Sequence, residues 1–166
     1  MKSFTNTCTF LIMLVSLGIC TPAVALPDDT KQPIKVKAKQ SEYNNIKGVM
    51  TYSGQVEFQQ GSIRLYADEV FIYLVDGSVT KMTANGKPAH FSQLLKAEDK
   101  QPLEAQGNYL EYNVNNGEIL IDGDAKLNRT GNNMSGGKIR YNVKDGSGQA
   151  NGGVEMTLQP DALGDQ

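Results

Sequence analysis

The chain has 166 residues, of which 39% are hydrophobic and 20% are charged, and its formal net charge is −2. This length suits one domain, and the mild acidity argues against a nucleic-acid binder, which normally carries a basic patch. The single histidine argues against a histidine-based metal site or proton relay.

The N-terminal residues have the three parts of a secretory signal peptide. Lys2 supplies the positive start, an apolar stretch runs over residues 10–19, and Ala23 and Ala25 form an A-x-A ending. The apolar stretch is about ten residues long, whereas a membrane-spanning helix needs roughly 20. The sequence therefore predicts a signal peptide at residues 1–25 that is cleaved after Ala25.

A lipoprotein cleavage site at Cys20 is the alternative, but Ile19 is large where such sites have a small residue. Cleavage after Ala25 removes both cysteines, Cys8 and Cys20. Residues 26–166 then form a single exported domain that has no disulfide and depends on its core for stability.

Apolar and polar residues alternate with a period of two along most of this domain, which is typical of β-strands with one buried face. Residues 70–74 are apolar at every position and predict a central strand that is covered on both faces. The alternating apolar positions are Ile34, Val36 and Ala38; Val56 and Phe58; Ile63 and Leu65; Ala125 and Leu127; Ile139, Tyr141 and Val143; and Val154, Met156 and Leu158.

Residue pairs that end in glycine separate these runs, often about 6–10 residues apart, and predict many short strands joined by tight turns. Residues 92–100 look briefly helical before Pro102, and we interpret them as a loop between two halves. The pairs are Lys47-Gly48, Ser53-Gly54, Gln60-Gly61, Asp76-Gly77, Asn85-Gly86, Asn116-Gly117, Asp122-Gly123, Gly136-Gly137, Asp145-Gly146 and Asn151-Gly152.

The two halves resemble each other when they are offset by 69 residues. Residues 42–44 (Glu-Tyr-Asn) then match residues 111–113, and residues 76–78 (Asp-Gly-Ser) match residues 145–147. Chance agreement between glycine-rich hairpins is the alternative, but duplication of a multi-strand unit explains the matches better. The predicted fold class is therefore all-β, with many short antiparallel strands and an internal duplication.

No arrangement of residues points to an enzyme. His90 is the only histidine and the sequence has no G-x-S-x-G motif, so a serine hydrolase would lack its nucleophile elbow. Asp68 and Glu69 are adjacent in a predicted strand and should point to opposite faces. Asp122 and Asp124 flank a turn glycine, where aspartate bonds to local backbone. The sequence thus predicts no catalytic residue, no cofactor and no metal site.

Four lysines lie close together near the predicted mature N-terminus: Lys31, Lys35, Lys37 and Lys39. They could meet phosphates on a ligand or partner. They could also solvate an edge strand and discourage unintended pairing, which is the interpretation we favour; both could hold. Residues 136–138 are too short for a phosphate-binding loop, so any ATP hydrolysis that drives this protein's process occurs elsewhere.

Five motifs follow one another in order: Gln32-Pro33-Ile34-Lys35-Val36; Thr51-Tyr52-Ser53-Gly54-Gln55-Val56, continuing through Gln60-Gly61 to Leu65-Tyr66-Ala67-Asp68; Gly86-Lys87-Pro88-Ala89-His90-Phe91; Ile119-Leu120-Ile121 before Gly123; and Gly136-Gly137-Lys138-Ile139-Arg140-Tyr141. Together they resemble the OstA-like β-jellyroll family of lipopolysaccharide-transport proteins. The match covers residues 30–158. The short tail after Pro160 departs from the family pattern.

The resemblance implies a twisted, open β-jellyroll whose apolar interior holds the acyl chains of lipopolysaccharide. It also implies a periplasmic protein, because the inner-membrane relative LptC retains a membrane helix and the outer-membrane relative LptD carries a large barrel. By resemblance, copies join head to tail, and LptC and LptD are partners in moving lipopolysaccharide from the inner to the outer membrane. The expected partner edges are Ile34, Lys35, Val36, Lys37 and Ala38 at one end and Val154, Glu155, Met156, Thr157 and Leu158 at the other.

The candidate lipid-binding residues are apolar positions on one strand face, and ordinary core packing is the alternative for each. They are Ile34, Val36, Val56, Phe58, Ile63, Leu65, Val70, Ile72, Leu110, Tyr112, Ile119, Ile121, Leu127, Ile139 and Tyr141. Two other functions stay open: a secreted carbohydrate-binding jelly roll, which the absence of tryptophan disfavours, and a β-sandwich enzyme, which the lone histidine disfavours.

Overall fold

The computed structural model describes residues 28–97 and 99–159. The predicted signal peptide and the tail after Pro160 therefore lie outside the described residues. One short helix precedes ten strands: η1 (Asp29–Lys31), β1 (Ile34–Lys37), β2 (Gln40–Asn44), β3 (Val49–Gln60), β4 (Ile63–Val75), β5 (Ser78–Gln93), β6 (Leu103–Asn113), β7 (Glu118–Arg129), β8 (Asn132–Asn142), β9 (Gly148–Asn151) and β10 (Glu155–Thr157).

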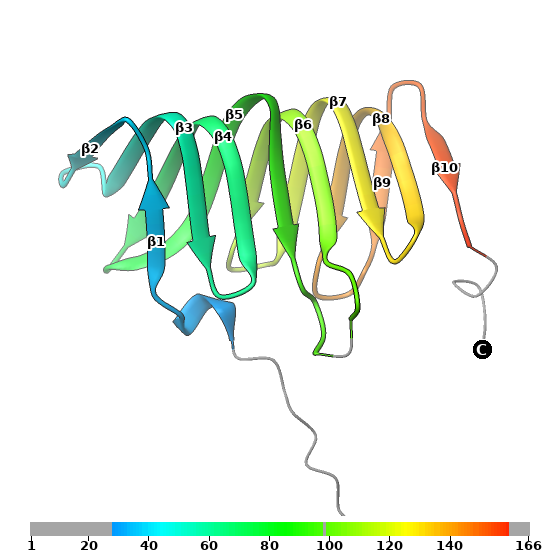
Figure 1. Cartoon of the computed structure of the whole chain (residues 1–166), viewed down its shortest axis with the longest axis horizontal. Helices are drawn as coiled ribbons and strands as arrows, with labels where there is room; N and C mark the ends of the chain where they lie inside the picture. Colours follow the sequence, from blue (N-terminus) through cyan, green and yellow to red (C-terminus); the bar gives the residue numbers. More distant parts are fainter. Residues whose placement is uncertain (1–27, 98, 160–166) are drawn as a thin grey trace, which may run out of the picture.

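The strands form a single antiparallel sheet that bends over on itself into two layers (Figure 1). Residues 49–53 of β3 pair with β2, whereas residues 56–60 of the same strand pair with β1. At the other end, β8 pairs with β10 through residues 133–135 and with β9 through residues 138–141. We call the layer bounded by β1 and β10 the front layer, and the layer bounded by β2 and β9 the back layer.

Each long strand crosses from one layer to the other at a corner, where the pairing register shifts. Four of the glycine pairs interpreted as hairpin turns lie inside strands at these corners: Ser53-Gly54, Asn85-Gly86, Asp122-Gly123 and Gly136-Gly137. The all-β antiparallel prediction is confirmed, but the six central strands are longer than predicted, at 11–16 residues. The reason is that a glycine pair permits a bulge inside a strand as readily as a reversal between strands.

Small residues are needed at the corners because the two layers converge there. Gly107 is buried in the β6 corner. A Cβ atom at this position would lie 2.7 Å from the Cγ2 methyl of Ile121 and 3.1 Å from the carbonyl oxygen of Asp122. The side chain of any other residue would therefore push the layers apart.

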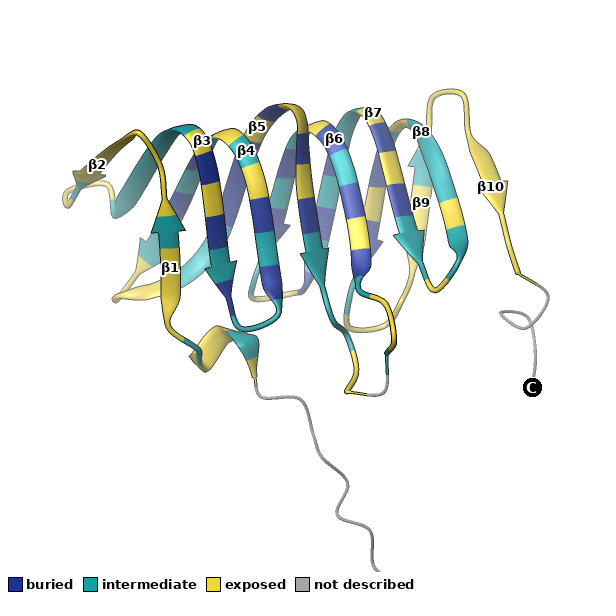
Figure 2. Ribbon diagram, in the orientation of Figure 1, coloured by how far each residue is buried: buried dark blue, intermediate teal, exposed yellow. Residues whose placement is uncertain are grey.

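Buried and exposed residues alternate along the strands, so that the inner face of the sheet is apolar and the outer face meets solvent (Figure 2). This alternation corrects the prediction for residues 70–74. Val70 and Ile72 are buried, but Phe71 and Tyr73 are only half-buried. They lie on the outer face, which no further layer covers within the described residues.

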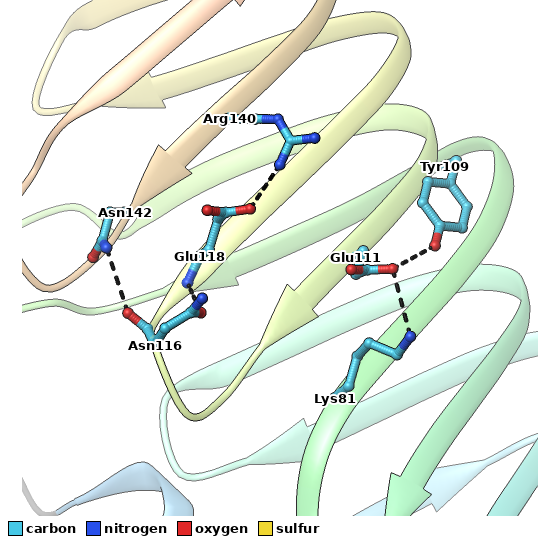
Figure 3. A network of polar contacts seen from close by, with 7 residues as sticks. All are labelled: Lys81, Tyr109, Glu111, Asn116, Glu118, Arg140 and Asn142. Carbon is cyan, nitrogen blue, oxygen red and sulfur yellow. Dashed lines mark hydrogen bonds and ion pairs between the residues drawn. The ribbon is translucent and has the colours of Figure 1, made fainter.

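Polar residues pair across strands on the outer face of the back layer (Figure 3). The Lys81 Nζ atom lies 3.8 Å from Glu111 Oε2, and the Tyr109 hydroxyl donates a hydrogen bond of 2.9 Å to the same carboxylate. Arg140 pairs with Glu118 at 2.9 Å. Such partly exposed pairs each contribute little stability, but they place charge outside and leave the interior apolar.

The offset of 69 residues relates strands as well as sequence. Shifting β3 by this offset gives the bounds of β7. The corners of these strands also share their backbone conformation, with φ of 83° at Gly54 and 77° at Gly123, and 53° at Gln55 and 51° at Asp124. The internal duplication itself stays a prediction. Within residues 28–97 and 99–159, no helix has the length and apolar character that a membrane span requires.

We expect Gly107→Ala to lower the free energy of unfolding by about 1–3 kcal/mol, because the added methyl group overpacks the β6 corner. Urea unfolding followed by circular dichroism measures this loss. Gly137→Ala in the β8 corner is the matched control, since its Cβ would meet only ordinary contacts at 3.4 Å or more. It should change the unfolding free energy by no more than about 0.5 kcal/mol. Equal losses in the two variants would contradict the close approach of the layers at Gly107.

Candidate functional site

The inner face of the front layer changes in character from the corners to the open side between the layers. At the corners, the inward residues are small apart from Val56. The middle of the layer carries a continuous apolar row, in which Val36, Phe58, Leu65, Phe91, Ala105, Leu127, Met134 and Met156 are register partners in turn. At the open side, which we call the seam, the inward row includes Gln60, Gln93 and Arg129. The interior is therefore apolar at depth and polar at its seam.

The predicted lining residues come together in this interior. Thirteen of the fifteen are buried in one cluster, whereas Val36 is half-buried and Ile34 is 40% exposed at the β1 edge. Burial agrees both with core packing and with a lipid site, so lipid binding by these residues stays a prediction. The cluster also contains residues that the sequence analysis missed, namely Met82, Ala84, Ala89, Phe91, Leu103 and Ala105. Phe91 follows an exposed His90 in β5, where polar residues and a corner interrupt the alternation.

Two side-chain contacts join the front layer to the back layer across the interior. The rings of Phe91 in β5 and Tyr112 in β6 lie 5.3 Å apart at an interplanar angle of 55°, a geometry that aromatic pairs favour. Towards the C-terminal end, the Arg129 guanidinium donates a hydrogen bond of 2.5 Å to the Tyr141 hydroxyl. The interior is thus held by one apolar contact in its centre and one polar contact near its end.

The helical turn η1 is fixed beneath the N-terminal half of the front layer. The Asp29 carboxylate accepts hydrogen bonds from the Ser62 backbone NH and hydroxyl and, at 3.0 Å, from the Gln93 side chain. The buried Gln60 amide donates to the carbonyl oxygens of Thr30 and Gln32. The N-terminal segment therefore covers this part of the seam. These contacts span up to 64 residues, and no local pattern in the sequence could have indicated them.

The C-terminal half of the seam is open, with a cavity of about 490 Å³. Its apolar lining comes from Leu127, Met134, Tyr141, Met156 and Leu158, and its polar lining includes Lys96, Asp99 and Arg129. Cavities of this size are typical of small-ligand sites. The open side of the interior therefore lies at this end of the molecule.

The two ends of the sheet expose apolar side chains. At the N-terminal end these are Ile34 and Tyr43, and at the C-terminal end they are Val154, Met156 and Leu158, all between 40% and 55% exposed. The strands themselves are shorter than the predicted edges. Ala38 lies outside β1, and Val154 and Leu158 flank β10, which spans Glu155–Thr157.

The polar residues that the sequence analysis considered do not form a reactive site. His90 is exposed on the outer face of β5, where it lines a shallow hollow of about 740 Å³ together with Tyr66 and Lys126. Asp122 forms an ion pair of 2.7 Å with Lys138, and Asp124 is exposed. Within the described residues, no three histidine, cysteine or acidic side chains group together as metal ligands would.

Three comparisons with known proteins agree. Residues 35–147 match the family described as "LptA/(LptD N-terminal domain) LPS transport protein". The chain is 31% identical to the lipopolysaccharide export system protein LptH of Pseudomonas aeruginosa over 95% of its length and 96% of the relative's. It is 32% identical to the lipopolysaccharide export system protein LptA of Escherichia coli K12 over 90% and 82%, respectively.

The fold is also similar to a solved structure. The crystal structure of P. aeruginosa LptH, described as "the LptA homologous periplasmic component of the conserved lipopolysaccharide transport device", aligns with a TM-score of 0.74 at 30% identity. The alignment covers 81% of this chain and 100% of that structure.

The interior makes a prediction for alkaline pH. Burial raises the pKa of the Tyr112 phenol, so the folded protein holds this proton at a pH where the unfolded chain, with a tyrosine pKa of about 10, loses it. The resulting stability is fully present below about pH 10 and is lost as the pH rises further. Burial and the hydrogen bond to Glu111 raise the pKa of Tyr109 in the same direction.

We therefore expect the unfolding free energy of the unmodified protein to fall above about pH 10, and to fall less steeply in Tyr112→Phe. Denaturant titrations at a series of alkaline pH values measure both slopes. Tyr66→Phe, which removes an exposed phenol, controls for the loss of one tyrosine. An unchanged slope in Tyr112→Phe would mean that the phenol is not held in a dry interior.

Proposed function

The chain belongs to the LptA/(LptD N-terminal domain) family of LPS transport proteins, and we propose that it carries lipopolysaccharide by holding the acyl chains between the layers of its folded sheet. It is a periplasmic transport component and not an enzyme, in line with its family. The observation that carries the lipid-binding proposal is the inner face of the sheet, which is apolar at depth, polar at the seam and open towards the C-terminal end.

The energetics of the acyl chains explain why such a carrier is required. Exposing an acyl chain to water costs about 0.8 kcal/mol per methylene. A chain of about 12 carbons therefore costs on the order of 9 kcal/mol, and lipopolysaccharide carries several such chains. An apolar interior removes most of this cost without any chemical step. Its polar seam suits the sugar end of the same molecule.

We further propose that copies of the chain add head to tail, and the directions of the edge strands support this arrangement. Direction alternates from strand to strand across the front layer, so that β1 and β10 run in opposite directions (Figure 1). The same alternation holds in the back layer between β2 and β9. A second copy placed by translation would thus continue both layers as antiparallel pairs, which is strand addition through a heterologous contact.

The side chains at the two ends also complement each other. The inward residues Ile34 and Val36 of β1 would meet the inward Met156 of β10. In the back layer, Tyr43 would meet the small inward residues of β9, because its neighbour in β8 pairs with Gly148. On the outer face, Lys35 would lie opposite the strand that carries Glu155, so that opposite charges face each other across the junction.

The partners LptC and LptD are proposed on resemblance alone, as the proteins at the two ends of such a bridge. A carbohydrate-binding role is the other candidate, favoured by the outer hollow in which the exposed Tyr66 ring lies beside polar side chains. The two functions differ in what they predict for the interior, since only lipid transport places a ligand there.

A photocrosslinking residue in place of Phe58, introduced in cells, should form an adduct with lipopolysaccharide that depends on cellular ATP. Phe58 is 1% exposed and faces the interior. The matched control is Glu57, the adjacent residue on the exposed face of the same strand, which should give no adduct. Adducts with glycan alone, or none from any inward position of the folded protein, would rule out lipid transport through the interior.

Met156→Asp should weaken self-association at least tenfold, about 1.4 kcal/mol, because the junction would bury an unpaired carboxylate. Met156 is 48% exposed in the single chain, so the variant should still fold. Thr157→Asp, one residue along on the outward face, is the control and should leave self-association unchanged. Sedimentation velocity over a range of concentrations measures both. Equal effects would show that β10 is not the junction strand.

A further inference from the structure

We propose that Arg129 binds a phosphate group of an acylated, phosphorylated sugar at the C-terminal end of the seam, where it selects phosphorylated lipids over unphosphorylated ones. This inference rests on the proposed function and names the part of the ligand that the open end of the interior recognises.

Arg129 differs from the other two arginines of the chain in its partners. Arg140 is held by the Glu118 carboxylate, and Arg64 donates to the carbonyl oxygens of Gly61 and Ile63. Within residues 28–97 and 99–159, the side chain of Arg129 bonds only to the Tyr141 hydroxyl. A guanidinium has five N–H donors, so most of those on Arg129 are available to a ligand.

Strand alternation turns Arg129 towards the interior. Ala125 and Leu127 are the preceding inward residues of β7, and both are buried. Arg129 continues this face at the level of the seam, where the equivalent position in β3 is the neutral Gln60. The one cation of this inward row therefore lies where the apolar depth ends and the polar head of an amphiphile would begin.

The surroundings of Arg129 suit an anionic head with acyl chains. It lines the 490 Å³ cavity together with Lys96, and the same cavity presents Leu127, Met134 and Met156 to the chains. Asp99 also lines the cavity, but its carboxylate accepts a hydrogen bond of 3.0 Å from the Lys96 backbone NH. The charged lining thus has one more cation than anions.

Two features position the guanidinium. The bond to Tyr141 fixes one of its nitrogens, Nη1. Gly146 leaves room for the same nitrogen, because a Cβ at position 146 would lie 2.9 Å from Nη1. The planar fork of arginine is well suited to phosphate, to which it can donate two parallel hydrogen bonds.

The test compares two lipids that share their acyl chains: lipid A with its phosphates, and the same lipid after dephosphorylation. Binding to the full mature protein is measured by calorimetry, with inorganic phosphate alone as a third ligand. We expect the unmodified protein to bind the phosphorylated lipid about tenfold more tightly, or about 1.4 kcal/mol. Arg129→Gln should abolish this preference and leave binding of the dephosphorylated lipid unchanged.

Arg140→Gln is the matched control, since it removes an arginine from the neighbouring strand on the outer face, and it should keep the full preference. Thermal unfolding verifies that each variant is folded. Arg129→Lys provides a second variant, which should retain part of the preference because it keeps the charge but loses the paired donors.

The outcomes separate this inference from the function on which it rests. If the unmodified protein binds neither lipid, the proposed function fails. If it binds both lipids equally, or if Arg129→Gln keeps the preference, the proposed function stands and the role of Arg129 is overturned. Inorganic phosphate that binds as tightly as the phosphorylated lipid, and through Arg129, would assign a free-anion site in place of a lipid headgroup site.

Discussion

The structure depends on one constraint: a single sheet has to bury its own apolar face. Within the described residues no helix and no second sheet is available to cover it, so the sheet folds over along a line of corners and packs against itself. This requirement accounts for the small residues at the corners, where the layers converge, and for the large apolar residues in the middle of each layer. It also leaves one long side unclosed, because corners join the layers along one side only.

Much of the interior could be predicted from the sequence because strand alternation is a local property. The runs around Phe58, Leu127 and Ile139 gave the inward faces correctly, and the same alternation places Arg129 inward, although the sequence analysis did not follow it that far. Corners could not be told from hairpins, since Asp122-Gly123 and Asp76-Gly77 look alike in sequence but lie within a strand and between strands, respectively. The contacts of Asp29 with Ser62 and Gln93 join distant segments, and no local pattern indicates them.

The unclosed side is not uniform along the molecule. At the N-terminal half, η1 covers the seam through the Asp29 carboxylate and the Gln60 amide. At the C-terminal half, the seam opens into a cavity where Arg129 reaches across to Tyr141. A long amphiphile held between the layers would therefore meet different polar groups at the two ends, which gives the interior a direction that its apolar depth alone does not have.

The alternating strand directions have a consequence for how the length of this fold can change. Each layer contains eight strand segments, an even number, and only an even number leaves the two edges of a layer running in opposite directions. Insertion or loss of one strand would reverse an edge and turn the junction between copies into a parallel pair, whereas insertion or loss of a hairpin would preserve it. The offset of 69 residues, which carries β3 onto β7, corresponds to a step of four strands and obeys this parity. Length in such a protein is therefore expected to vary in whole hairpins, and the span of an assembly to vary in whole copies.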